Sequence, residues 1–188
     1  MKSPVSRSPA ALSRTTSAAP VMRSRRKAKT PEEGNERDSF QHWVLRYHDV
    51  FLSSPQSRID RIRQGVPAED FKVFIVQLGI TQEKVCRMLD IAPATVNRKA
   101  ALHQPLSREE SEKVIGMAKL IGQVEAMLAD SGDPEAMKDF DARKWVARWM
   151  DEPIPALGGH TPAEYMDTFE GQELISSLLK TMQTGAYA

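Results

Sequence analysis

Four polar residues in the middle of the chain have side chains suited to nucleic acid: Thr95, Asn97, Arg98 and Lys99. Asn makes paired hydrogen bonds with adenine edges and Arg with guanine edges, whereas Thr and Lys suit phosphate oxygens. Residues 82–99 also carry apolar side chains at the spacing of two short helices packed on each other, with Ile91 in the turn. The second helix of such a unit lies in the major groove of DNA. The pattern therefore predicts a DNA-binding helix-turn-helix unit, although any helical hairpin can show the same spacing.

The start of the second helix offers few contacts to DNA. The run Ala-Pro-Ala at 92–94 has no hydrogen-bonding side chain, so direct readout of bases rests on Asn97 and Arg98. Asp90 stands where a positive φ is expected, a conformation that Asp tolerates better than most residues. Two copies of the unit reading two half-sites would give more specificity than one.

A strongly basic segment precedes these elements. Residues 1–30 contain eight Lys and Arg and no acidic residue. Ser, Ala and Pro dominate residues 1–35, which have too little apolar surface to offset the entropy of ordering, so we expect a disordered basic tail. Its densest basic run includes Arg25 and Arg26 and is suited to phosphates or a minor groove. A solubilising extension is the alternative.

No residue pattern indicates catalysis. Cys86 falls on an apolar helix face, and the four histidines lie far apart without the spacing of metal ligands. The sequence has neither a Gly-rich phosphate loop nor a nucleophile elbow. We therefore expect no enzyme activity, no cofactor, no metal and no small-molecule substrate.

The net charge of +1 over 188 residues averages two unlike ends, because residues 125–188 contain twelve acidic and five basic residues. No stretch approaches the roughly 18–20 apolar residues of a membrane span. A single cysteine cannot form an internal disulfide. We expect a cytoplasmic protein without membrane contact.

Helices must position these side chains, since apolar residues recur at spacings of three and four and no segment alternates as a strand would. The sequence predicts an all-α protein. The expected helices cover 36–52, 67–78, 82–89, 93–101, 107–130 and 169–182, with a short one at 145–150 and a closing loop at 53–57. These helices form a helix-turn-helix domain at 36–104, a connecting helix at 105–131 and a small C-terminal subdomain at 132–188.

One apolar row follows the long helix that a capping box at Ser107 and Glu110 opens. The row consists of Val114, Met117, Ile121, Val124 and Leu128. This spacing is expected where a helix packs along another helix, either in the core of this chain or in a second copy. The second alternative makes 105–131 a dimerisation helix. Gly116 and Gly122 are tolerable in this helix where they let another backbone approach.

The last third contains a segment that cannot be helical, from Pro153 to Gly159, followed by a second capping box that Thr161 and Glu164 form. Residues 149–162 read Trp-Met-Asp-Glu-Pro-Ile-Pro-Ala-Leu-Gly-Gly-His-Thr-Pro. This string, together with residues 88–99 and 106–112, resembles the Xre/ParS (MbcA-like) antitoxins of bacterial type II toxin–antitoxin systems. The resemblance covers roughly residues 61–188.

The resemblance implies three roles. The helix-turn-helix would bind the operator of its own operon, the middle helix would dimerise, and the C-terminal subdomain would bind a RES-domain toxin that consumes NAD⁺ or transfers ADP-ribose, blocking its active site. The implied toxin-binding residues are Trp149, Pro155, Leu157, Gly158, Gly159, Thr161, Pro162 and Tyr187. The alternative is a free-standing helix-turn-helix regulator whose C-terminal subdomain binds another protein.

Overall fold

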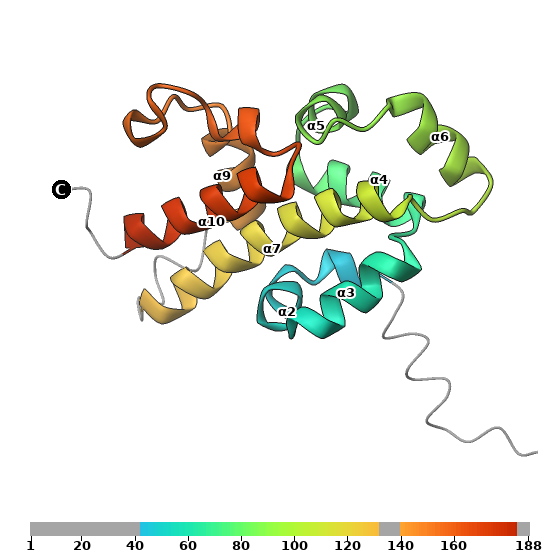
Figure 1. Ribbon diagram of the computed structural model, residues 1–188, viewed down its shortest axis with the longest axis horizontal. Helices are drawn as coiled ribbons and strands as arrows, with labels where there is room; N and C mark the ends of the chain where they lie inside the picture. The colour runs from blue at the N-terminus through green and yellow to red at the C-terminus, as the bar shows by residue number, and fades with distance from the viewer. Residues whose placement is uncertain (1–41, 132–139, 184–188) are drawn as a thin grey trace, which may run out of the picture.

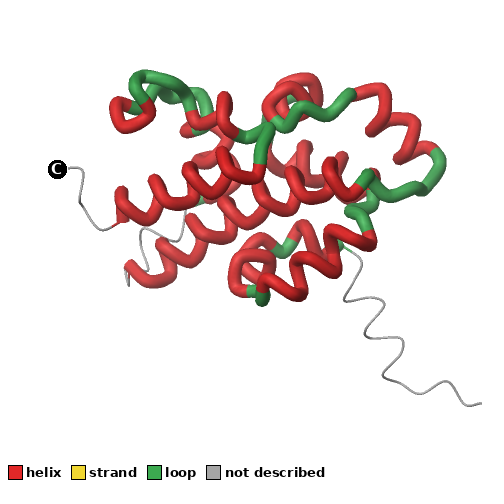
Figure 2. The backbone as a smooth tube through the Cα atoms, in the orientation of Figure 1, coloured by secondary structure: helices red, strands yellow, loops and turns green. Residues whose placement is uncertain are grey.

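The computed structural model describes residues 42–131 and 140–183, and every regular element in these two stretches is a helix (Figures 1 and 2). The predicted all-α class is confirmed. The elements in chain order, with η for a short 3-10 helix, are η1 (Trp43–Leu45), α2 (Tyr47–Leu52), α3 (Pro55–Gln64), α4 (Ala68–Leu78), α5 (Gln82–Met88), α6 (Pro93–Ala101), α7 (Arg108–Ser131), α9 (Ala142–Trp149), η2 (Pro155–Leu157), η3 (Pro162–Tyr165) and α10 (Phe169–Gln183). The predicted tail at 1–35 lies outside the described residues.

The long helix α7 is the centre of the fold, because α2, α3, α9 and α10 all pack against it (Figure 1). Its apolar row is enclosed by these neighbours: Val114, Met117, Ile121 and Val124 are buried and Leu128 is half-buried. A side chain enclosed in the core of its own chain has no surface for a second copy. The interpretation of this row as a dimer interface is therefore wrong for its four buried residues, and packing in the chain's own core is confirmed.

Two glycines let other parts of the chain approach α7 closely. A Cβ at Gly122 would lie 1.9 Å from the carbonyl oxygen of Tyr47, so this glycine admits the backbone of α2. A Cβ at Gly116 would lie 1.6 Å from the Oε1 atom of Gln172, a buried side chain of α10 that donates to two main-chain carbonyls. The expected close approach of another backbone is confirmed at Gly122, whereas Gly116 admits a side chain.

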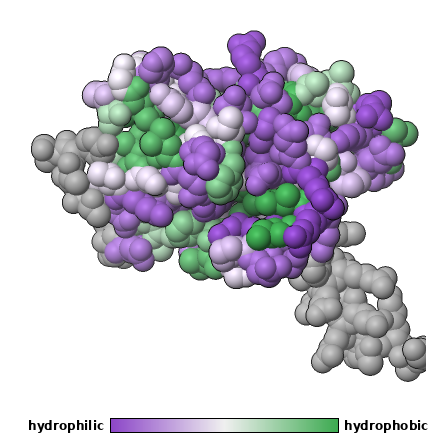
Figure 3. All heavy atoms as spheres, in the orientation of Figure 1, coloured by the Kyte–Doolittle hydropathy of each residue, from purple (hydrophilic) through white to green (hydrophobic). Residues whose placement is uncertain are grey.

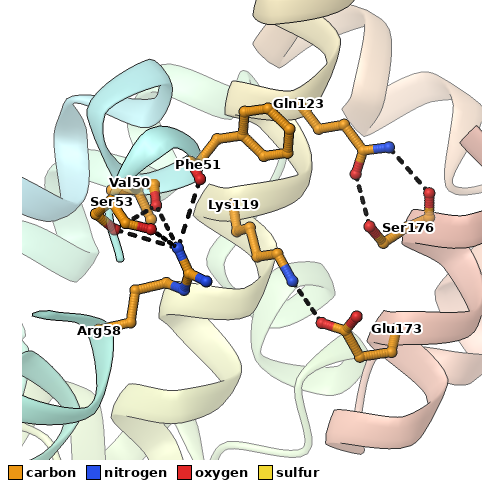
Figure 4. Close-up of polar contacts among 8 residues, drawn as sticks. All are labelled: Val50, Phe51, Ser53, Arg58, Lys119, Gln123, Glu173 and Ser176. Carbon is orange, nitrogen blue, oxygen red and sulfur yellow. Dashed lines mark hydrogen bonds and ion pairs between the residues drawn. The ribbon is translucent and has the colours of Figure 1, made fainter. Parts of the chain in front are cut away.

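Polar groups also join α7 to α10, which lies beside it (Figures 1 and 4). The buried side chain of Gln123 donates to the carbonyl of Ser176 at 2.9 Å and accepts from its hydroxyl at 2.7 Å. Nearer the start of α10, Lys119 forms an ion pair with Glu173. Because buried polar groups are costly without partners, the Gln123–Ser176 pair fixes how these two helices align.

The first elements differ from the single helix predicted at 36–52. The described part of that range is divided into η1 and α2 by Arg46, whose φ of −101° and ψ of 76° are not helical. The helix α3 was not predicted, and the loop expected at 53–57 is wrong from Pro55 onward. Its only aliphatic side chains are Ile59 and Ile62, which form too short a row to indicate a helix. Its start signals are local: Ser54 accepts a hydrogen bond from the Ser57 amide at 3.1 Å, and Pro55 occupies the first turn.

The side chain of Arg58 connects α3 to the end of α2. Its guanidinium donates to the carbonyls of Val50, Phe51 and Ser53 (Figure 4). The last carbonyls of a helix have no partner within the helix, so Arg58 supplies one from the next element.

The remaining predicted helices are confirmed to within two residues at their ends, except that α9 begins at Ala142, three residues before the predicted 145. Both capping boxes are present. The second box opens the 3-10 helix η3. One hydrophobic core runs through the predicted segments 36–104, 105–131 and 132–188. Within the described residues, no helix is long and apolar enough to cross a membrane.

Candidate functional site

The helix-turn-helix geometry is present at α5 and α6. The hydroxyl oxygen of Thr81 accepts from the Lys84 amide at 3.3 Å and caps α5. Asp90 in the turn has a φ of 48°, which confirms the expected positive φ, and the Ile91 amide closes the turn by donating to the Cys86 carbonyl at 2.8 Å. Cys86 itself is fully buried, and burial raises the pKa of its thiol to about 11.

The outer face of α6 is narrower than predicted. Val96 and Ala100 are buried and hold α6 against its neighbours, and Thr95 is half-buried. The exposed face consists of Pro93, Ala94, Asn97, Arg98 and Ala101. Of the predicted base-reading residues, Asn97 and Arg98 therefore stand where DNA would reach them.

Lys99 does not face outward as predicted. Its ammonium lies 2.6 Å from the Glu110 carboxylate, and only 15% of its side chain is exposed. Burial works to raise the pKa of Glu110, but hydrogen bonds from Lys99 and Ser107 outweigh it and hold that pKa below its usual range. The prediction of an outward Lys99 is wrong, because this lysine joins α6 to the capping box of α7.

Gln82, which sequence reasoning missed, contacts the exposed face of α6. This first residue of α5 donates from Nε2 to the Asn97 Oδ1 atom at 3.3 Å and to the Pro93 carbonyl at 3.5 Å. The only signal for Gln82 in the sequence is its position directly after Thr81, the residue that caps α5. In a helix-turn-helix unit this position lies near the start of α6. Gln82 thus pairs with the amide of Asn97 at the exposed face of α6.

The second candidate surface is the loop from Ile154 to His160, which projects from the body beside α9 and α10 (Figure 1). Its ends are joined by the Ile154 amide, which donates to the His160 carbonyl at 3.0 Å. The Gly159 amide donates to the Ile154 carbonyl at 3.0 Å, and Gly158 and Gly159 have φ values of 68° and 88°. These bonds give the loop a defined shape. The prediction that the segment from Pro153 to Gly159 cannot be helical is wrong for Pro155–Leu157, which form the 3-10 helix η2, because a proline is tolerated in the first turn of a helix.

The predicted toxin-binding residues differ in how far they are exposed. Pro155, Gly158 and Gly159 are exposed. Trp149, Leu157 and Pro162 are buried and belong to the interior, so the prediction that they contact a partner directly is wrong. Thr161 is half-buried and Tyr187 lies outside the described residues, as do Arg25 and Arg26.

The base of the loop is fixed by its polar groups. The amide and hydroxyl of Thr161 donate to the Glu164 carboxylate at 2.9 and 3.1 Å, and the Nδ1 atom of His160 lies 2.9 Å from it. These contacts, the Thr161 amide foremost, lower the pKa of Glu164. Hydrophobic residues are visible on the surface between this loop and α10 (Figure 3), and α10 exposes 46% of Leu174.

The loop region also contacts the helix-turn-helix. Lys84 of α5 forms an ion pair with Asp151, which directly follows α9 and its C-cap Met150, and α5 contacts η3. A cleft of about 410 Å³ lies between them, lined by Lys84, Arg87, Met88, Asp90, Asp151, Ala163, Glu164 and Asp167. Among the residues that the structure describes, no group of His, Cys, Asp and Glu is arranged to hold a metal ion.

Both parts of the chain match known protein families. A family model described as an antitoxin Xre-like helix-turn-helix domain matches residues 57–119, and one described as the antitoxin Xre/MbcA/ParS C-terminal toxin-binding domain matches residues 135–185. A protein of Sphingobium sp. (strain YBL2) named "Prs ADP-ribosylating antitoxin" is 45% identical over 142 residues, which are 76% of this chain and 87% of the relative.

Proposed function

Because the chain belongs to the Xre/MbcA/ParS antitoxin family, we propose that it neutralises a RES-domain toxin by blocking the active site of that toxin and represses its own operon by binding DNA. As an antitoxin the chain is not an enzyme. The name of the Sphingobium relative pairs an antitoxin with ADP-ribosylation. Transfer of ADP-ribose takes that group from NAD⁺, which supports a toxin that consumes NAD⁺ or transfers ADP-ribose.

The observation that carries toxin binding is the shape of the 154–160 loop. It lies within the matched toxin-binding domain, is closed by its own backbone hydrogen bonds and exposes Pro155, Gly158 and Gly159. A preorganised loop loses little conformational entropy when it docks, so more of its contact energy becomes affinity.

The charge of this part of the chain fits a basic nucleotide-binding cleft. Some of its carboxylates form ion pairs within the chain, such as Asp141 with Arg143 and Glu173 with Lys119. Glu152, Asp167 and Glu170 are exposed. Complementary charge speeds the encounter of two proteins and disfavours wrong partners.

A matched pair of alanine-to-arginine variants tests toxin binding. Ala156 is exposed in the loop and Ala101 is exposed on α6. We expect Ala156→Arg to abolish rescue when the full chain is co-expressed with a RES-domain toxin that the unchanged chain neutralises, because the larger side chain prevents docking. Ala101→Arg should keep rescue. Circular dichroism checks that both variants fold. Rescue by both would contradict docking through this loop. Failure of the unchanged chain to rescue would favour a regulator whose C-terminal part binds another protein.

Operator binding is proposed through Asn97 and Arg98 on bases, Thr95 beside them, and the basic tail with Arg25 and Arg26 on phosphates. A cationic segment that binds phosphates releases counterions from DNA and makes affinity depend steeply on salt. Deletion of residues 1–30 should weaken binding to the operon's upstream DNA and flatten the salt slope, with toxin rescue retained. Equal affinity of both chains at low and moderate salt would refute a role for the tail.

We also propose that two copies bind two half-sites, since one α6 offers few base-reading side chains. The contact between copies uses a surface other than the buried row of α7. A mass near 42 kDa, twice the 21.0 kDa of the chain, in light scattering would support the homodimer, and a monomer on and off DNA would refute it.

A further inference from the structure

The exposed face of α6 has an apolar beginning and a polar middle. Pro93 and Ala94 occupy its first two positions, and Asn97 and Arg98 follow one turn later. The preceding residue, Ala92, makes no side-chain cap, and Pro93 has no amide hydrogen. The N-terminal end of a recognition helix is the part that reaches base edges. Here that end presents only small apolar side chains.

Such a surface fits one base better than the other three. In the major groove only thymine presents a methyl group, and small apolar side chains are its usual partners. A guanine edge or a cytosine amino group covered by Pro93 and Ala94 would lose its hydrogen bonds to water and gain none. Apolar burial therefore favours thymine at the base pairs that face the start of α6.

The geometry of Gln82 defines the neighbouring contact. Its Nε2 atom donates to Oδ1 of Asn97 at 3.3 Å, which sets the side of the Asn97 amide that carries the oxygen. A carbonyl oxygen has two lone pairs, so Oδ1 retains one for the amino group of adenine while Nδ2 donates to N7. Gln82 thus acts on the base through Asn97 and is a positioning residue.

We propose that α6 recognises thymine methyl groups through Pro93 and Ala94, next to an adenine read by Asn97 in the orientation that Gln82 sets. This inference rests on the proposed operator binding and adds to it the chemistry of the bases that are read.

The first test selects bound DNA and removes methyl groups from it. The full chain enriches random-sequence duplexes, and the best duplex is then made with single thymines replaced by deoxyuridine, which lacks only the methyl group. We expect binding to weaken about fourfold at each thymine facing Pro93 or Ala94. The matched variants Ala94→Ser and Ala101→Ser, both at exposed positions, serve as the control. Ala94→Ser should lose the preference for thymine over uracil, and Ala101→Ser, two turns further along, should keep it.

The second test concerns Gln82. Replacing the recognised adenine with 7-deazaadenine removes the N7 acceptor and should weaken binding by the wild type about tenfold. Gln82→Ala should reduce that sensitivity, since the Asn97 amide is then free to turn, whereas loss of a phosphate contact alone would leave the sensitivity unchanged.

The outcomes distinguish operator binding itself from the readout of thymine and adenine by α6. Enrichment of no sequence would overturn operator binding and this inference together. Enrichment of a sequence whose uracil version binds equally well, or equal behaviour of the two serine variants, would overturn only the readout by Pro93 and Ala94. Unchanged 7-deazaadenine sensitivity in Gln82→Ala would overturn the role of Gln82.

Discussion

At the scale of single residues, Gly122 sets the distance between two helices. Its hydrogen atom faces the Tyr47 backbone, where a Cβ would meet the carbonyl oxygen at 1.9 Å and the carbonyl carbon at 2.4 Å. A backbone carbonyl cannot turn aside as the end of a long side chain can. Any larger residue at 122 must therefore move α2 away from α7.

We predict that Gly122→Ala lowers the free energy of unfolding by about 1–3 kcal/mol or more, because overpacking costs outweigh the gain in helix propensity. Urea unfolding measures the difference.

Ala129→Gly is the control for this prediction, since Ala129 is exposed on the same helix and its replacement should show only the propensity loss of about 1 kcal/mol. A Gly122→Ala protein as stable as the wild type, or more so, would show that the helices do not approach this closely.

The structure also changes which single residues belong to the predicted DNA-binding and toxin-binding surfaces. Lys99 and Trp149 are of types suited to phosphate and to protein contact, but Glu110 pairs with the first and the core encloses the second. The residues that are exposed to a partner are instead Asn97 and Arg98 on α6 and Pro155 in the loop.

At the scale of elements, the start of α7 is a junction as well as a helix end. The Glu110 carboxylate accepts from the Ser107 amide at 2.6 Å and pairs with Lys99 of α6. One carboxylate thus caps α7 and joins it to α6.

This junction predicts a pH dependence. The lowered pKa of Glu110 means that its stabilisation is complete above its ordinary value of 4.5 and is lost as the pH falls through the lower folded value. Glu110→Gln should lose about 1 kcal/mol at pH 7 and show a smaller change in stability than the wild type between about pH 5 and pH 3.

Thermal unfolding at several pH values measures this difference, with Glu109→Gln as the control, because Glu109 is exposed. Parallel pH profiles of the wild type and Glu110→Gln would contradict the assignment.

At the scale of the whole molecule, a single core joins the two family domains. The helix α7 extends from the matched helix-turn-helix domain, which ends at residue 119, to Ser131, and α10 of the toxin-binding domain covers it. The Lys84–Asp151 ion pair adds a contact on the surface.

A chain that ends at residue 131 should therefore lose its cooperative thermal transition and bind a hydrophobic dye, because removal of α9 and α10 uncovers the apolar face of α7. Calorimetry and dye fluorescence check this result against the full chain. A sharp transition in the shortened chain would mean that the first part folds alone. Toxin binding is accordingly tested better by point variants in the loop than by truncation.

The parts of the fold that depend on neighbouring residues in the chain were predictable. The capping boxes at Ser107 and Thr161 and the apolar rows of α4 and α10 gave helix ends to within two residues. The helix α3 was not predictable from an apolar row, because Ile59 and Ile62 are its only aliphatic side chains. Its cap at Ser54 is a local signal of the same kind as the two capping boxes.

The sequence by itself determined the helical class, the positive φ of Asp90, the charge of the two ends and the family, because each depends on local sterics or on the order of residues along the chain. Tertiary structure alone decided which side of α7 is covered, which residue of α6 Glu110 binds, and that Gln82 forms a hydrogen bond with Asn97. An apolar row predicts that some surface covers it but does not identify that surface, because the hydrophobic effect is non-directional and acts equally between any two apolar surfaces. The same holds for a polar side chain, whose role is set by the partner that folding brings within hydrogen-bond distance.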